Sequence, residues 1–311
     1  MTTPAAADGR FATRVPPSAR RWLKLVAFSG VTAALVLTLR SVDWSKMTTA
    51  LRDAQPGWFL VGVLANAAIL PCWALFWKTL RPRSEEPVTF ARMLEITSIS
   101  SALMNALPFG GGHASSIVLL IKRGNTTQRG ALSVLALDQL GEGVLKVMVL
   151  AGASAVMPLP TWMRAALTTV LLVVGAWLLT LVIVSRLTNE LEVLKSVGRS
   201  SAALACVAGM KLVELLAIVA VQASLGVHIS LGGSLLVLAT VILATMLPIS
   251  PGNLGTYEAS VFLAYRYLGV SPELALSLAV AQHACFIIPS VGVGYGFFSS
   301  SLAPLPRSNR V

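Results

Sequence analysis

The chain has 311 residues, of which 55% are hydrophobic and 12% are charged. Soluble domains carry about 25% charged residues, so this composition excludes an ordinary soluble protein and predicts a polytopic, all-α membrane protein. Lys and Arg number 24 against 13 Asp and Glu, a net charge of +11. Membrane orientation explains that excess better than nucleic acid, and no nucleic-acid partner is expected.

A helix needs about 20 apolar residues to cross the bilayer. We predict a disordered basic cytoplasmic tail over 1–21, a single transmembrane domain over 22–302 and a short basic cytoplasmic tail over 303–311. About six full transmembrane helices are expected, at residues 22–40, 56–78, 130–156, 163–185, 201–227 and 274–300.

Two further apolar regions, between Glu95 and Lys122 and between Leu231 and Leu268, contain helix-breaking residues. These residues are Pro108, Gly110, Gly111 and Gly112 in the first region, and Pro248, Pro251, Gly252, Asn253 and Gly255 in the second. Broken backbone is tolerated at membrane depth only inside protein or beside a water-filled cavity. The pattern therefore predicts two re-entrant, broken helix pairs, with eight full spans as the alternative.

Cationic residues support the re-entrant topology. If both ends of the chain are cytoplasmic and each broken pair returns to the side it entered, only Arg40, Lys46, Arg52 and Arg164 lie outside. This distribution agrees with the positive-inside rule. The two breaks then enter from opposite sides, which suggests an inverted repeat of the kind found in transporters.

Ionisable residues within apolar helices are costly and need a partner or a purpose. Asp138, Glu142 and Lys146 follow one another at i, i+4 and i+8 and form one stripe, and Lys211 and Glu214 make an i, i+3 pair. Two interpretations stay open for both groups: ion pairs that fix helix packing, or the polar wall of a path for a lipid headgroup.

Glu258 follows the second break, where a new helix is expected to begin. It could cap that helix, or line a midplane cavity and bind a cationic headgroup or a proton. Arg266 lies on nearly the same helical face and could bind phosphate or extend to the interface. His113 and His283 are either satisfied core groups or groups that titrate near neutral pH.

Most tryptophans fall near predicted helix ends, which favours interfacial anchoring. They are Trp22, Trp44, Trp58, Trp73, Trp77, Trp162 and Trp177. The segment from Trp44 to Ala54 is expected to form a short surface helix. No metal site or cofactor is expected, since Gly110 to Gly112 lack the Gly-Lys-Ser/Thr that would complete a nucleotide loop.

Three motifs resemble the membrane domain of lysylphosphatidylglycerol synthases and their stand-alone, flippase-like relatives. They are Leu107-Pro-Phe-Gly-Gly-Gly112, Asp138-Gln-Leu-Gly-Glu-Gly143 and Leu247-Pro-Ile-Ser-Pro-Gly-Asn-Leu-Gly-Thr-Tyr-Glu258. The resemblance covers roughly residues 20–300, and the last motif is the most specific. Gln139 and His283 stand where it leads us to expect arginine.

The resemblance implies movement of a lipid between leaflets of the bacterial inner membrane. That lipid could be a phospholipid, an aminoacylated lipid or a polyprenyl-linked sugar. Because the chain ends shortly after its last predicted helix, we expect no aminoacyl-transferase domain and no synthesis of lysyl-lipid by this chain.

Three functional hypotheses follow. The first is a lipid translocator with a groove between the two breaks. The second is a non-catalytic partner of a lipid-synthesising or lipid-glycosylating enzyme. The third is a lipid-modifying membrane enzyme, for which Asp138 and Glu142 would be the candidate carboxylates. The sequence leaves the oligomeric state open.

Overall fold

The computed structural model describes residues 43–107, 111–157, 161–188, 197–245 and 250–302, and every regular element within these ranges is helical. The all-α membrane fold predicted from composition is therefore confirmed. The span predicted at 22–40, the two terminal tails, and Pro108, Gly110 and Pro248 lie outside the described residues.

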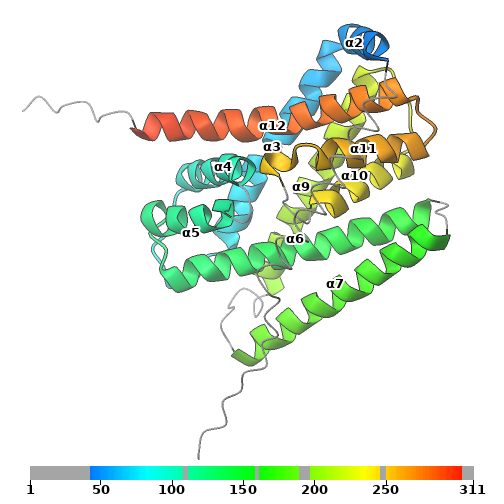
Figure 1. The fold of residues 1–311 in the computed structure, drawn as a ribbon. Coiled ribbons are helices and arrows are strands. Elements are labelled where there is room, and N and C mark those ends of the chain that lie inside the picture. The colour runs from blue at the N-terminus through cyan, green and yellow to red at the C-terminus, as the bar shows by residue number, and fades with distance from the viewer. Residues whose placement is uncertain (1–42, 108–110, 158–160, 189–196, 246–249, 303–311) are drawn as a thin grey trace, which may run out of the picture. The chain divides into compact units, whose positions relative to one another are not determined.

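Long helices occupy the other five predicted spans (Figure 1). They are α3 (Pro56–Leu80), α6 (Gln128–Val156), α7 (Thr161–Thr188), α9 (Val197–Ser224) and α12 (Pro272–Leu302). Within the described residues, three stretches are long and apolar enough to cross a membrane: Pro56–Leu80, Gly198–Ser224 and Pro272–Ser300. The 29 residues of α6 would extend about 43 Å at 1.5 Å per residue, although three charged side chains interrupt its apolar face.

The short surface helix is also present, as α2 (Trp44–Arg52). Asp43 caps it, because its carboxylate accepts a hydrogen bond from the Ser45 amide at 3.0 Å. The hydroxyl of Ser45 donates to the same carboxylate, and this bond lowers the pKa of Asp43.

The first break separates α4 (Phe90–Ala106) from α5 (Gly111–Arg123), and the two helices pack side by side (Figure 1). Gly112 permits their close approach. A Cβ atom at this position would lie 2.4 Å from the Cα of Met104, far inside van der Waals contact. The prediction that Gly111 and Gly112 break the helix is wrong, because both lie in the first turn of α5, where Gly112 serves the packing of α5 against α4.

The second break lies between α10 (Leu231–Thr245) and α11 (Thr256–Tyr267), and it contains a 3-10 turn, η1 (Pro251–Asn253). Gly252 and Gly255 have φ angles of +59° and +85°. Residues with a Cβ rarely adopt such angles, which explains the glycines. Asn253 also has a positive φ, of +55°, a conformation that asparagine tolerates better than most residues.

The turn in the second break packs against the helix that precedes the first break. The turn η1 packs against α4, and a Cβ on Gly252 would lie 3.6 Å from the backbone oxygen of Asn105 near the end of α4. Helix α12 contacts both α4 and α11, and α3 packs along α9. Side chains from α3, α6, α9 and α12 consequently converge on the region where the helices are interrupted.

Arg81 joins several elements beyond the end of α3. Its guanidinium donates to the backbone oxygens of Gly124 at 2.8 Å and Glu86 at 3.0 Å, and its Nε donates to the Thr126 hydroxyl at 3.2 Å. Arg199 of α9 donates to the backbone oxygen of Thr79 at 2.7 Å. These contacts tie the end of α3 to the α5–α6 connection and to α9.

Candidate functional site

Two adjoining cavities lie between α3, α6, α9 and α12. The wide chamber, of about 540 Å³, and the narrow chamber, of about 210 Å³, share seven lining residues. The shared residues are Asn66, Ile69, Glu142, Lys146, Thr245, Asn253 and Phe286. The chambers therefore adjoin along a wall that carries charged and amide side chains.

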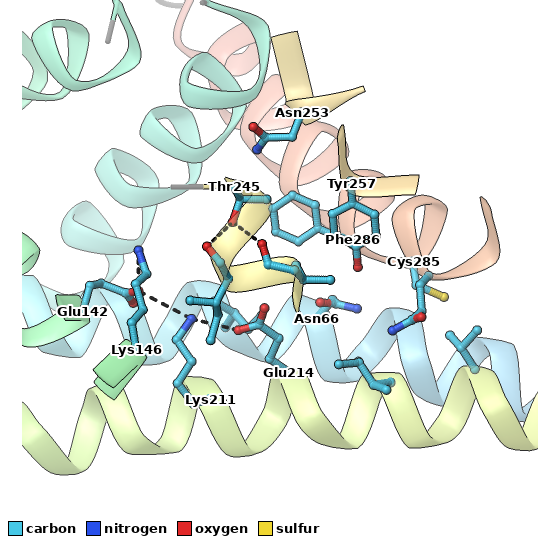
Figure 2. Close-up of a pocket in the computed structure, with 17 residues that line it drawn as sticks. Asn66, Glu142, Lys146, Lys211, Glu214, Thr245, Asn253, Tyr257, Cys285 and Phe286 are labelled. Carbon is cyan, nitrogen blue, oxygen red and sulfur yellow. Dashed lines mark hydrogen bonds and ion pairs between the residues drawn. The ribbon is translucent and has the colours of Figure 1, made fainter. Parts of the chain in front are cut away.

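A chain of four alternating charges runs along this wall (Figure 2). Glu142 lies 3.6 Å from Lys146 on its own helix and 3.4 Å from Lys211 on α9, and Lys211 lies 2.9 Å from Glu214. The sequence predicts the pairs within each helix, whereas the contact from Glu142 to Lys211 across helices was not expected. The four charges sum to zero, which reduces the cost of placing them among apolar helices.

Asp138 has different partners from those expected. It is 3% exposed, and its Oδ1 accepts hydrogen bonds from the indole N–H groups of Trp73 at 2.9 Å and Trp77 at 2.8 Å. Gln139 donates to its other oxygen at 3.2 Å. Among the described residues no ion pair joins Asp138 to a cation, so its carboxyl group lines the wide chamber with hydrogen-bond donors as its only partners there.

The interpretation of Trp73 and Trp77 as interfacial anchors is wrong. Trp77 is fully buried in the core, and both indoles point their N–H groups at Asp138. Their position near a predicted helix end is compatible with either role. Only the packing of α3 against α6 decides between them.

His113 enters the wide chamber from α5, next to the first break. Its Nε2 lies 3.4 Å from the Nε2 of Gln139. Gln139 thus connects His113 to Asp138, and residues 113 and 138 face the same chamber although they lie on different helices.

Glu258 and His283 form a pair at the second break and line neither chamber. The Glu258 carboxylate accepts the backbone N–H of Gly255 at 2.7 Å, which makes it a cap of α11, and its other oxygen lies 2.6 Å from His283 Nδ1. The capping interpretation of Glu258 thus fits the geometry, and the residue is not part of the lining of either chamber. His283 Nε2 lies 2.9 Å from the backbone oxygen of Gly252.

The neighbours of this pair do reach the narrow chamber. Tyr257 stacks on the His283 ring with centroids 4.4 Å apart, and both Tyr257 and Asn253 line the chamber (Figure 2). Gln282, adjacent to His283, lines it as well. From the sequence, Asn253 is named only as part of the second break, and neither Tyr257 nor Gln282 is singled out, because polar uncharged residues give no distinct signal.

Arg266 is separate from this arrangement. It is exposed on α11 and donates a hydrogen bond to the backbone oxygen of Val270. It lines neither chamber, so the structure does not bring it together with Glu258.

The sequence model for the lysylphosphatidylglycerol synthase TM region matches residues 21–294. The match includes α2 to α11, both chambers and most of α12. No curated protein gives a significant match to the chain. This match agrees with the resemblance carried by the three motifs, and the chain belongs to the family of the lysylphosphatidylglycerol synthase transmembrane region.

Proposed function

We propose that this protein moves a membrane lipid between leaflets, with the lipid headgroup passing through the two chambers and its hydrocarbon chain remaining in the bilayer. The family establishes a membrane protein of lipid-related function. The observation that carries the proposal is the joined pair of chambers lined by Asp138, the four-charge chain and several amides. A polar wall of this kind among apolar helices offers hydrogen bonds to a headgroup that the bilayer core cannot supply.

In this proposal the α4–α5 and α10–α11 pairs are re-entrant and open from opposite sides of the inner membrane, with both chain ends cytoplasmic. The basic residues near the ends of α3 and α5, among them Arg81, Lys122 and Arg123, support a cytoplasmic position for that end. The contact of η1 with α4 supports a route that runs between the two breaks.

The full chain, purified and reconstituted into liposomes, provides the test. Phospholipids with a fluorescent headgroup-proximal label are placed in both leaflets, and a membrane-impermeant reductant removes the signal from the outer leaflet. Protein that moves lipid exposes the inner-leaflet label to the reductant, whereas empty liposomes retain about half of their total fluorescence. No loss beyond that of empty liposomes, for headgroups of any charge, would overturn the proposal.

A matched pair of variants links the activity to the chamber. Asp138→Asn removes the uncompensated carboxylate and is expected to slow lipid movement. Asp43→Asn makes the same chemical change at the cap of α2, where asparagine caps a helix about as well as aspartate. Equal activity of the two variants would argue that the wide chamber is not the route.

The cargo can be identified from lipids that remain bound through gentle purification. Mass spectrometry of wild type and Asp138→Asn is expected to show one phospholipid, aminoacylated lipid or polyprenyl-linked lipid that is depleted in the variant. Co-purification of a lipid-synthesising or glycosylating enzyme, with no transport by the chain alone, would instead favour the partner role.

A further inference from the structure

We infer that Glu258 and His283 form a proton-binding site that fastens the second break to α12, and that binding and release of this proton are coupled to passage of the lipid. The proton site stands on the geometry of the pair. Its coupling to transport rests on the proposed function.

The hydrogen-bonding capacity of the two side chains fixes the number of protons. A backbone oxygen only accepts, so His283 Nε2, 2.9 Å from the oxygen of Gly252, must carry a hydrogen. His283 Nδ1 lies 2.6 Å from Glu258 Oε1, and this contact also needs a hydrogen. A neutral imidazole has only one N–H, so a second proton must lie on Nδ1 or on the carboxyl group of Glu258.

Loss of that proton leaves one contact without a hydrogen. If Nε2 keeps its hydrogen, the lone pair of Nδ1 faces the Glu258 carboxylate. If the hydrogen moves to Nδ1, the lone pair of Nε2 faces the Gly252 oxygen. Either arrangement is repulsive at these distances, so loss of the proton weakens the attachment of α12 to the turn or to the start of α11.

Weaker attachment of α12 to the second break would affect the residues that line the proposed lipid path. Gly252 precedes Asn253, which lines both chambers, and Glu258 follows Tyr257, which lines the narrow one. Gly252 and Asn253 hold positive φ angles, a backbone arrangement that persists only when surrounding contacts maintain it. The protonated pair supplies two of those contacts, so deprotonation is expected to change the shape of the narrow chamber.

Few other titratable groups face the pair in the described part of the chain. Tyr257 of α11 stacks on the imidazole, and Cys285 of α12 and the Lys211–Glu214 pair of α9 line the chamber beyond it. The near end of α4 places the backbone oxygen of Asn105 close to Gly252. Tyr265 is engaged with Gln222 and Gln282. Lys211 and Glu214 neutralise one another, which leaves Glu258 as the charged partner in direct contact with His283.

Nuclear magnetic resonance tests the proton site without a transport assay. The sequence contains three histidines, so the ring nitrogens of 15N-histidine protein can be assigned with His113→Gln, His228→Gln and His283→Arg. We expect the His283 signals to show hydrogens on both ring nitrogens at the lowest pH at which the protein stays folded, and on one ring nitrogen at the highest. In Glu258→Gln the amide can donate to Nδ1, so both contacts of His283 can be made by a neutral ring with its hydrogen on Nε2, and the His283 signals should change less with pH than in wild type. A His283 spectrum that is constant over this pH range in wild type would overturn the proposal.

Liposome transport at different pH values tests the coupling. His283→Arg keeps donors for Glu258 and Gly252 but cannot release its proton, so the pH dependence of lipid movement should disappear, as it should in Glu258→Gln. His228→Gln changes an exposed histidine between α9 and α10 and should retain the wild-type dependence. His113→Gln should also retain the wild-type pH dependence, whatever its rate of lipid movement.

The outcomes separate the two proposals. If wild type moves lipid at a rate independent of pH, the coupling is overturned and the transport function stands. The same conclusion follows if the pH dependence is lost in His113→Gln and kept in His283→Arg. Absence of any lipid movement by wild type would overturn the proposed function and the coupling together, while the resonance titration would still decide whether Glu258 and His283 bind a proton.

Discussion

The indole N–H of Trp77 donates a hydrogen bond to Asp138 Oδ1 at 2.8 Å, and this contact joins α3 to α6. Trp73, one turn earlier, donates to the same oxygen at 2.9 Å, with the two rings edge to face. A buried carboxylate that has no cation beside it is stabilised by such donors, because they point toward the negative charge.

Trp77→Phe should therefore destabilise the protein by about 1.5–3 kcal/mol, the usual contribution of a hydrogen bond to a charged group. Thermal unfolding in detergent would measure the change. The matched control is Trp58→Phe on the same helix, where the side chain is 47% exposed. A similar loss for both variants would contradict the assigned role. In an Asp138→Asn background the cost of Trp77→Phe should be smaller, because the acceptor is then uncharged.

Lys211 occupies the interior of the four-charge chain, between Glu142 and Glu214, whereas Lys146 ends it. Lys211→Met leaves two carboxylates without their shared cation, and breaking a buried ion pair in this way costs about 3–5 kcal/mol. Lys146→Met should cost less, since that side chain is 27% exposed and contacts one carboxylate. Comparison of the two unfolding temperatures tests this order. Equal losses of stability, or a larger loss in Lys146→Met, would show that the four-charge chain does not act as one unit.

The sequence predicts those parts of the site that lie on one helix or in one short motif. The i, i+3 and i, i+4 spacings predict the pairs Lys211–Glu214 and Glu142–Lys146, because helix geometry alone places such residues side by side. Proline and glycine predict both interruptions, since their backbone preferences are local.

Contacts between helices could not be predicted in the same way. Glu142 meets Lys211 only because α6 crosses α9, and His283 meets Glu258 only because α12 packs against α11. Neither relationship has a sequence period, since the rotation of each helix is decided by packing over its whole length. For the same reason Trp77 could not be distinguished from an interfacial tryptophan until α3 was placed against α6.

Gly112→Ala should disrupt the packing of α4 against α5. The added methyl group would lie 2.4 Å from the backbone of Met104, and backbone cannot move aside as a flexible side chain can. Gly209→Ala is the matched control, because a Cβ at that position of α9 meets nothing within 4 Å. Replacing a helical glycine there should stabilise the protein by roughly 0.5–1 kcal/mol. A Gly112→Ala protein as stable as the Gly209→Ala protein would refute the close approach of the two helices.

Arg81→Lys should loosen the junction between α3 and the α5–α6 connection. The guanidinium reaches the Thr126 hydroxyl and the backbone oxygens of Glu86 and Gly124 in three directions at once. A lysine ammonium carries its donors on one atom and cannot satisfy three separated acceptors. Because Arg81 is only 6% exposed, some acceptors would remain buried without a donor, at a cost of about 1–3 kcal/mol.

Arg52→Lys, in the exposed last turn of α2, provides the control. Faster amide exchange over residues 124–127 in Arg81→Lys alone is the expected result, and unchanged exchange there would mean that charge, rather than the guanidinium geometry, holds this junction.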